Sequence, residues 1–502
     1  MIFMSLYEKL TEYCASDVYP FHMPGHKRRA CSMQDPFSFD ITEIDGFDNL
    51  HHAEGVLKEA RERAADLYHS SETHFLVNGS TAGILSAILA CVPVGGLLLM
   101  ARNSHRSAYN AVSLRDIRTE YLYPAEGHIP PDTASCHSYT ESYMDINGPI
   151  DPADVEKALS VPGRELPSAV FLTSPTYDGI VSDVKAIADI VHRYRIPLIV
   201  DEAHGAHFGM HPAFPESSVA LGADIVIHSL HKTLPSLTQT ALLHVNGDLT
   251  DRRKLRAMLS VFQTSSPSYV LMASIDSCIR LLAEYGDELF DHYIHILCHF
   301  REQAQFELIE VLRTDDPSRI LLRPRNISAR KLYELLRDRY HLQPEMLAPS
   351  YVLMLTSVCD SEEGFDRLLQ ALKEINELPP QECPDLCRDH LEDSGDNRKV
   401  LADACEVPGD AAAAPADRPV VRLSVYHALN SPQCKVDIHE AAGHISAEYL
   451  YLYPPGVPLV APGEEITPGL IRLAERLTED GYELQGTEDY TLSSIWIIKE
   501  DT

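Results

Sequence analysis

The stretch ADIVIHSLHKTLPSLTQTALLHV, residues 223–245, contains the pattern that decides the fold. The stretch contains two short runs of apolar and β-branched residues, 224–229 and 241–245. A polar cluster begins at the end of the first run. That cluster consists of His228, Ser229, His231 and Lys232. A surface lysine needs no such neighbours, whereas a lysine near the end of a buried strand must be compensated by the groups around it. The cluster is therefore a candidate functional site.

The same strand-like composition recurs on the N-terminal side of this stretch, with helical spacing between the runs. Strands that alternate with helices predict an α/β fold with a mostly parallel sheet covered by helices on both faces. In such sheets the ligand binds beyond the carboxyl ends of the strands, and the polar clusters of this chain follow predicted strands. The further predicted strands are residues 74–78, 97–101, 169–174 and 197–204. Residues 246–315 look helical, and SSIWIIKEDT at the end of the sequence is predicted to be a strand.

Composition and charge exclude several classes of protein. The formal net charge of −32 argues against a nucleic-acid partner, because a phosphate backbone requires a basic surface. Such a charge favours cationic small molecules, although it is also a common solubility feature. We expect neither a signal peptide nor a membrane span, and eleven scattered cysteines fit a reducing cytoplasm.

Asp201 and Lys232 each follow a predicted buried strand, about thirty residues apart. Pyridoxal 5'-phosphate uses both residue types, a lysine as a Schiff base and a carboxylate against the pyridinium nitrogen. The carboxylate favours the protonated ring nitrogen, which makes the ring an electron sink. A buried Asp201–Lys232 salt bridge explains the pair equally well at this point.

A candidate phosphate site lies in VNGSTAGILSAI, residues 77–88, where a strand turns into a helix near Ser80. Free backbone N–H groups and the positive end of the helix favour an anion there, and Ser80 and Thr81 add hydroxyl donors. An ordinary helix cap is the alternative. Ser229 and His231 could contact the same phosphate, so three separate clusters fit one ligand.

Three further groups of residues need an interpretation. His105, in RNSHRSAYNAV, either stacks on a cofactor ring or caps a helix through the backbone. His204, His207 and His211 suggest a metal-dependent hydrolase, but their spacing does not place them on one helix face, so we expect no metal site. The residues Cys383, Cys387, His390 and Cys405 are interpreted as free side chains in a linker.

With these motifs in place, the sequence resembles the bacterial ornithine/lysine/arginine decarboxylase family. The motifs run in family order along nearly the whole chain. They are FHMPGHKR (21–28), DNLHHAEG (48–55), FLVNGSTAG (75–83), NSHRSAYNA (103–111), SPTYDGIVSD (174–183), DEAHGAHFG (201–209), HSLHKTLPSLTQTALLHV (228–245), TSSPSY (264–269) and YPPGVPL (453–459).

The resemblance implies a role for each candidate residue. Lys232 is the Schiff-base lysine, Asp201 the partner of the ring nitrogen and His105 the stacking residue; these three are the expected catalytic residues. His204 lies near the ring hydroxyl. Ser265 or Ser266 reaches the phosphate of a neighbouring subunit. The phosphate is held by Ser80, Thr81, Ser229 and His231.

The resemblance also implies the aspartate-aminotransferase fold (type I of the pyridoxal-phosphate enzymes) for the large domain, followed by smaller α/β domains. The expected division is an N-terminal segment at the active site and dimer (1–70), a cofactor-binding large domain (71–275), a helical and small α/β domain (276–379), a linker or insertion (380–418) and a C-terminal domain (419–502). The departures are Pro235, where much of the family has a small residue, and residues 440–451, which fit the family only loosely.

The expected reaction is decarboxylation of a basic amino acid in cytoplasmic polyamine metabolism. Arginine is favoured as the substrate and agmatine as the product, because the short form without an N-terminal wing domain most resembles biosynthetic arginine decarboxylases. Lysine and ornithine come next. A homodimer, or a pair of dimers, is expected. The alternatives are another reaction on the same fold, such as transamination or aldol cleavage, and a non-catalytic relative.

Overall fold

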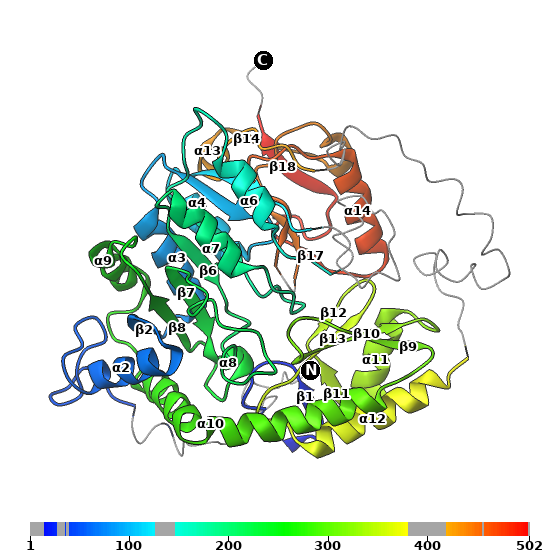
Figure 1. Ribbon diagram of the computed structural model, residues 1–502. Helices are drawn as coiled ribbons and strands as arrows, with labels where there is room; N and C mark the ends of the chain where they lie inside the picture. Colours follow the sequence, from blue (N-terminus) through cyan, green and yellow to red (C-terminus); the bar gives the residue numbers. More distant parts are fainter. Residues whose placement is uncertain are drawn as a thin grey trace, which may run out of the picture.

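A seven-stranded sheet forms the centre of the structure (Figure 1). The computed structural model describes residues 15–27, 36, 40–125, 146–379, 418–453 and 456–499. Neighbouring strands are parallel except that β8 runs antiparallel to both β2 and β7, which confirms the predicted α/β fold. In their order across the sheet, the strands are β2 (Glu72–Leu76), β8 (Ala241–Val245), β7 (Ile225–Ser229), β6 (Leu198–Asp201), β5 (Ala169–Thr173), β3 (Leu97–Ala101) and β4 (Arg118–Leu122).

Helices cover both faces of this sheet, and the central strands are therefore apolar on both sides. In β7, Ile225 and Ile227 pack beneath α3, α4 and α9, whereas Val226 packs beneath α6 and α7. Complete burial of one such side chain contributes about 1.5–3 kcal/mol, which is why these strands appear in the sequence as continuous apolar runs. The helices are α3 (Gly79–Cys91), α4 (Arg106–Leu114) and α9 (Arg252–Phe262) on one face, with α6 (Pro152–Leu159) and α7 (Val184–Arg193) on the other.

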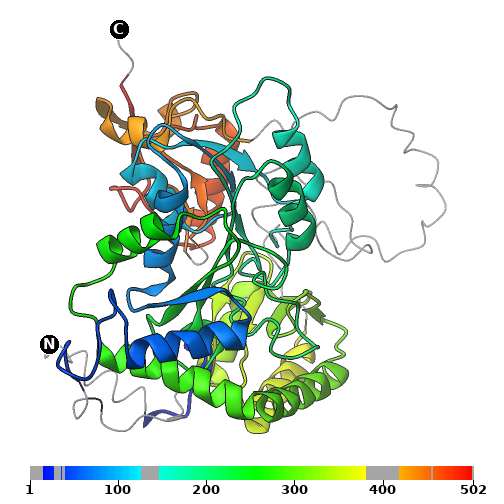
Figure 2. The same ribbon diagram turned by 60° about the vertical axis from the view of Figure 1, so that its left-hand side comes forward.

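A second layer of the molecule is built around the long helix α10 (Tyr269–Gln303), which lies alongside α2 (Val56–Tyr68) in Figure 2. Beyond it, a four-stranded antiparallel sheet packs on α11 and α12. The helix expected through 246–315 is confirmed for α9 and α10 but is wrong at 309–312, which form a strand. The elements are β9 (Ile309–Leu312), β10 (Arg319–Pro324), β12 (Met346–Leu347), β13 (Val352–Leu355), α11 (Ala329–Glu334), a π-helical turn (Leu335–Arg339) and α12 (Glu362–Asn376).

The N-terminal strand β1 (Tyr19–Phe21) pairs with β11 (Leu342–Pro344) in parallel, so the segment carrying FHMPGHKR lies against this smaller sheet. Residues 418–499 form a further α/β layer with its own apolar core. Its elements are α13 (Val425–Asn430), β14 (Gln433–Asp437), a 3-10 turn (Ile438–Glu440), β15 (Leu450–Leu452), β16 (Pro458–Val460), α14 (Pro468–Glu479), β17 (Leu484–Gln485) and the predicted last strand β18 (Ser494–Ile498).

A buried ion pair joins this C-terminal layer to the central sheet. Arg102, which directly follows β3, lies 2.9 Å from a carboxylate oxygen of Glu464, and both side chains are about 1% exposed. The guanidinium also donates to the backbone oxygens of Pro458 and Leu459, at 2.8 and 3.2 Å. Burial raises the pKa of Glu464, and Arg102 opposes that shift. The pair therefore fixes the chain just before His105 to the C-terminal layer.

Replacing Arg102 with methionine is expected to lower the free energy of unfolding by about 3–5 kcal/mol, because Glu464 would be left buried without its cation. Chemical denaturation followed by circular dichroism measures this change. The matched control is Arg422→Met, which breaks an exposed pair with Glu465 at 2.7 Å and should cost less than about 1 kcal/mol. Equal effects of the two substitutions would contradict the importance of burial.

No helix among the described residues is both long and apolar enough to cross a membrane. The interpretation of residues 380–418 as a linker or insertion falls, apart from Arg418, outside the described residues, as do the cysteines and histidine at positions 383, 387, 390 and 405.

Candidate active site

Lys232 lies at the carboxyl end of β7, in the short helix α8 (Leu230–Thr233) that begins directly after the strand. Its Nζ is 2.8 Å from Nε2 of His204. Burial lowers the pKa of Lys232 to about 8, with Arg319 acting in the same direction and Asp201 and Glu345 opposing it. A lysine with this pKa is partly neutral near physiological pH, which a nucleophilic amine requires.

Asp201 ends the neighbouring strand β6 and is 4% exposed. One carboxylate oxygen accepts a hydrogen bond from the N–H of Ala203 at 3.1 Å. Burial raises the pKa of Asp201, while Lys232, the Ala203 N–H and His228 act against that rise. The described structure contains no Asp201–Lys232 ion pair within 4.0 Å, since Lys232 contacts His204 instead. The salt-bridge interpretation is therefore not supported, and Asp201 keeps an oxygen for a cationic group.

His204 is buried between Lys232 and Arg319. The Arg319 guanidinium donates to the backbone oxygen of His204 at 2.8 Å and approaches Nδ1 at 3.4 Å. Because arginine can only donate, Nδ1 accepts and the ring proton is assigned to Nε2, which donates to Lys232 when that amine is in its neutral form. Burial, Lys232 and Arg319 all lower the pKa of His204 well below its usual value, so the ring is neutral.

His105 has the helix-capping role that was one of its two interpretations, and its stacking on a cofactor ring stays a prediction. Its Nδ1 caps α4, accepting from the Ser107 N–H at 3.2 Å. Burial and the charge of Lys232 lower the pKa of His105 to about 3, so the cap is a neutral imidazole close to the lysine. The C-terminal layer meets the same ring, because a Cβ added at Gly456 would lie 3.8 Å from His105 Cδ2. The ring therefore lies where the central sheet, Lys232 and the C-terminal layer come together.

The start of α3 fits the predicted phosphate site. Its N-cap residue Asn78 makes no side-chain capping bond, and Gly79 has a φ of +73° with open space where a side chain would be. Ser80 is half-buried and Thr81 exposed. The hydroxyl of Ser229 is buried without a hydrogen-bond partner among the described residues, which is unusual unless a ligand supplies one.

His231 and Ser265 lie near this region in different ways. His231 Nδ1 bonds the Thr240 carbonyl at 3.0 Å, and burial lowers the pKa of His231 to about 4. Donation to a phosphate through its other nitrogen therefore requires the doubly protonated ring. Ser265 and Ser266 are exposed in a turn whose Thr264 N–H approaches the Asn78 side chain at 3.4 Å. Their predicted reach to a neighbouring subunit needs that exposure.

Tyr177, Arg319 and Glu345 belong to the same site but were not predicted from the sequence as site residues. The Tyr177 hydroxyl donates to Glu345 at 2.5 Å, and its ring lies 4.5 Å from the His204 ring, centroid to centroid. Glu345 also accepts from the N–H of Met23 at 2.8 Å, which ties the N-terminal segment to the site. Only the SPTYDG motif gave a local signal, because Arg319 comes from strand β10 of the smaller sheet and Glu345 from the bend between β11 and β12.

Replacing Glu345 with glutamine is expected to lower the pKa of Lys232 below its value of about 8. The carboxylate stabilises the ammonium form, so its loss should shift the titration midpoint toward acid by about 0.5 unit. Competitive labelling of Lys232 with acetic anhydride across the pH range measures the midpoint. The exposed Glu288→Gln is the charge-matched control, and an unmoved or alkaline midpoint in Glu345→Gln would contradict the assignment.

The three histidines that suggested a metal site have separate partners. His204 contacts Lys232, His207 bonds Asp316 at 3.1 Å and His211 bonds Asp291 at 3.1 Å. In the described ranges no group of three or more metal-ligating side chains converges on a point where an ion could bind. The geometry gives the hydrolase interpretation no support.

The arrangement as a whole fits a phosphorylated aldehyde cofactor with a basic ring nitrogen. A lysine of lowered pKa, a buried carboxylate with an unused oxygen, an orphaned serine hydroxyl and an uncapped helix start all lie at carboxyl ends of strands or directly after them. These are the groups that pyridoxal phosphate requires.

Known proteins match the chain along nearly its whole length. Residues 4–338 match the family model described as Orn/Lys/Arg decarboxylase, major domain, and residues 421–481 match the C-terminal domain of the same family. Arginine decarboxylases of Bacillus anthracis and Bacillus subtilis are 28% and 29% identical, covering 99% of this chain and 97% and 98% of theirs. The crystal structure of the Francisella novicida lysine decarboxylase LdcF has a TM-score of 0.74 at 19% identity, covering 98% of this chain and 80% of that one.

Proposed function

Because the chain belongs to the Orn/Lys/Arg decarboxylase family, we propose that it removes the α-carboxylate of L-arginine with pyridoxal 5'-phosphate as cofactor. The family makes it a decarboxylase of basic amino acids. Arginine is proposed because the Bacillus relatives named arginine decarboxylase match over almost their full length. The observation that carries the proposal is Lys232, whose pKa falls to about 8 beside His204 and Asp201.

When bound, pyridoxal phosphate supplies an electron sink for the electron pair left on Cα as carbon dioxide departs. Lys232 is the proposed attachment point of its aldehyde and, with a nearby histidine, the proposed source of the proton returned to Cα. Asp201 would hold the ring nitrogen protonated, and the neutral ring of His105 would lie against the cofactor. His204 would offer its Nε2 proton near the ring hydroxyl. The proposed phosphate ligands are Ser80, Thr81, Ser229, His231 and, from a neighbouring subunit, Ser265.

The substrate assignment is tested by incubating the enzyme separately with arginine, lysine and ornithine and identifying the amine formed. Agmatine should be the main product, with cadaverine and putrescine formed far more slowly. Preferential formation of either of the other two would overturn the choice of arginine while leaving the decarboxylase in place. Measuring carbon dioxide against keto acid in the same reactions separates decarboxylation from transamination, which the family does not favour.

Several properties around this activity are part of the proposal. We infer a cytoplasmic enzyme of polyamine synthesis that works as a homodimer, or as a pair of dimers, with Ser265 completing the partner's site. The five-part division at residues 70, 275, 379 and 418 is retained as a proposal. Sedimentation analysis tests the dimer: a purely monomeric active enzyme would refute the role of Ser265.

A further inference from the structure

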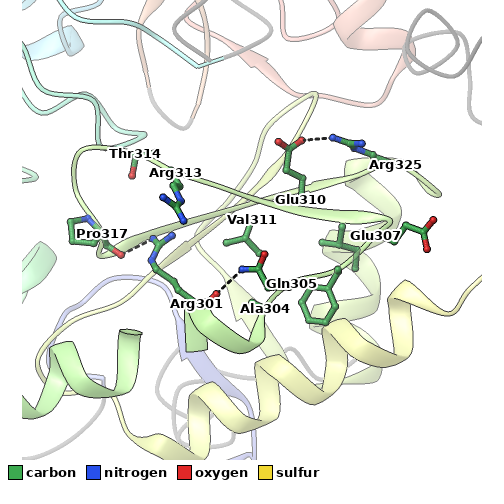
Figure 3. Close-up of a pocket in the computed structure, with 12 residues that line it drawn as sticks. Arg301, Ala304, Gln305, Glu307, Glu310, Val311, Arg313, Thr314, Pro317 and Arg325 are labelled. Atoms are coloured by element: carbon green, nitrogen blue, oxygen red, sulfur yellow. Dashed lines mark hydrogen bonds and ion pairs between the residues drawn. The ribbon is translucent and has the colours of Figure 1, made fainter. Parts of the chain in front are cut away.

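A pocket of about 460 Å³ lies on the smaller sheet, at the C-terminal end of α10 (Figure 3). Strand β9, the turn that follows it and Arg325, just beyond β10, form the other side. Its lining combines charged and apolar residues, namely Arg301, Ala304, Gln305, Phe306, Glu307, Ile309, Glu310, Val311, Arg313, Thr314, Pro317 and Arg325. A volume of this size accommodates a small metabolite.

Two arginines in this pocket point toward one another without a carboxylate between them (Figure 3). Arg301 uses only one nitrogen, Nη2, which donates to the backbone oxygens of Pro317 and Arg319, both at 2.9 Å. Its Nε is buried and has no acceptor in the described part of the chain. Arg313 forms no hydrogen bond or ion pair with any described residue. Arg313 is exposed, so its donors face solvent and are available to a ligand that enters the pocket.

The acidic residues of the pocket do not neutralise this pair. Glu310 is engaged by Arg325 at 3.3 Å, at the opposite end of the pocket. Glu307 lies at that same end, with its carboxylate pointing away from the two arginines (Figure 3). Burial lowers the pKa of the Arg301 guanidinium; Tyr293 and Asp316 oppose that shift, and repulsion from the positive charge of Arg313 adds to it. An anion between the two would remove this repulsion.

The chemistry of the lining specifies the anion. Two guanidinium groups offer more paired donors than the two oxygens of a carboxylate can accept, whereas a phosphate has three oxygens for them. Phe306, Ile309 and Val311 supply an apolar surface in the same pocket. We propose that this pocket binds a small organic phosphate, with Arg301 and Arg313 on the phosphate and the apolar side chains against the organic part.

The pocket is connected to the catalytic lysine by a continuous series of hydrogen bonds. Arg301 donates to the backbone oxygen of Arg319, whose guanidinium donates to the backbone oxygen of His204, and His204 lies 2.8 Å from Lys232. A ligand that draws Arg301 toward itself therefore acts on the residue that positions His204. The bound phosphate is an effector of the decarboxylase, and this part of the inference rests on the proposed function.

Isothermal titration of the holoenzyme with phenyl phosphate, at constant ionic strength, tests the binding site. The wild-type protein should bind it, and Arg313→Ser should weaken binding at least about tenfold, the scale of a lost charged hydrogen-bonded pair. Arg325→Ser is the matched control, since that arginine lines the same pocket but already has Glu310 as partner; it should change affinity less than about twofold. Benzoate should bind more weakly and benzylammonium not at all.

Absence of binding at millimolar phenyl phosphate, or equal affinity in the wild type and Arg313→Ser, would overturn the site. The coupling is tested by turnover of arginine with saturating phenyl phosphate. We expect at least about a twofold change in kcat or KM that Arg313→Ser removes. An unchanged rate with intact binding would overturn the effector role. Binding is measured without turnover, so a failure of the proposed activity is distinguishable from a failure of this pocket.

Discussion

Replacing Lys232 with alanine is expected to lower decarboxylation at least about 10³-fold, because one side chain provides both the covalent attachment and the proton transfer. The purified variant should also lose the visible absorbance that the bound cofactor gives the wild-type protein, and borohydride should no longer fix the cofactor to the chain. Absorbance spectra and carbon dioxide release measure the two effects independently.

The control for this prediction is Lys254→Ala, an exposed lysine on α9 that pairs with Asp251 at 3.8 Å. It should keep both the spectrum and the rate. In the cofactor-free state, the thermal unfolding midpoint of Lys232→Ala should not fall below that of the wild type, since the substitution removes a buried amine whose charge is costly. A full visible band in Lys232→Ala would refute the assignment of the lysine, whatever the rate.

The central sheet was predictable from the sequence because its strands are buried on both faces. Strands β3 and β8 coincide with the predicted runs, and β7 differs by one residue. Strand β4 was not predicted, because RTEYL alternates polar and apolar residues at the sheet edge, where only one face needs to be apolar. The sequence predicts helix where β9 lies, because the four residues IEVL are too few to show a strand period.

The candidate site was predictable only where each residue follows a strand of the central sheet. Lys232, Asp201 and His105 follow β-rich runs, and the rule that ligands bind at the carboxyl ends of strands brings them together. Arg319 and Glu345 lie more than eighty residues further along the chain, the first in strand β10 and the second between β11 and β12. Their contacts with Tyr177 and His204 depend on how the two sheets pack, and no local pattern encodes that packing.

The second large effect is expected from Asp201→Asn. The amide keeps the shape of the carboxylate and can still accept from the Ala203 N–H, but it carries no charge to hold the ring nitrogen protonated. Removing one preorganised electrostatic group of this kind lowers kcat about 10²–10³-fold. The visible absorbance should remain, because Lys232 is intact. Unchanged turnover would remove Asp201 from the mechanism.

Asp224→Asn is the matched control for this substitution. Asp224 is also buried with a raised pKa, but it directly precedes β7, at the amino ends of the parallel strands. There its carboxylate bonds the His192 ring at 2.9 Å and accepts from the Leu198 N–H at 2.8 Å. Its replacement should leave the turnover of the folded enzyme unchanged. Loss of turnover in both variants would mean that the effect comes from a disturbed sheet.

The same substitution should have the opposite sign on the stability of the cofactor-free protein. Because burial raises the pKa of Asp201 in the folded chain, the unfolded chain loses its proton first as the pH rises. The carboxylate therefore destabilises the folded state increasingly from the unfolded pKa of about 3.9 up to the folded pKa, and the loss of stability is complete above the folded pKa.

Asp201→Asn lacks this loss of stability, so the free energy of unfolding of the apoprotein at pH 8 should rise above that of the wild type. At about pH 3, where both forms are neutral, the difference should shrink. A carboxylate that lowers the stability of the cofactor-free protein but raises the rate of the holoenzyme is retained for catalysis. Denaturation of both apoproteins at the two pH values, together with the turnover rates of both holoenzymes, distinguishes this role from a structural one.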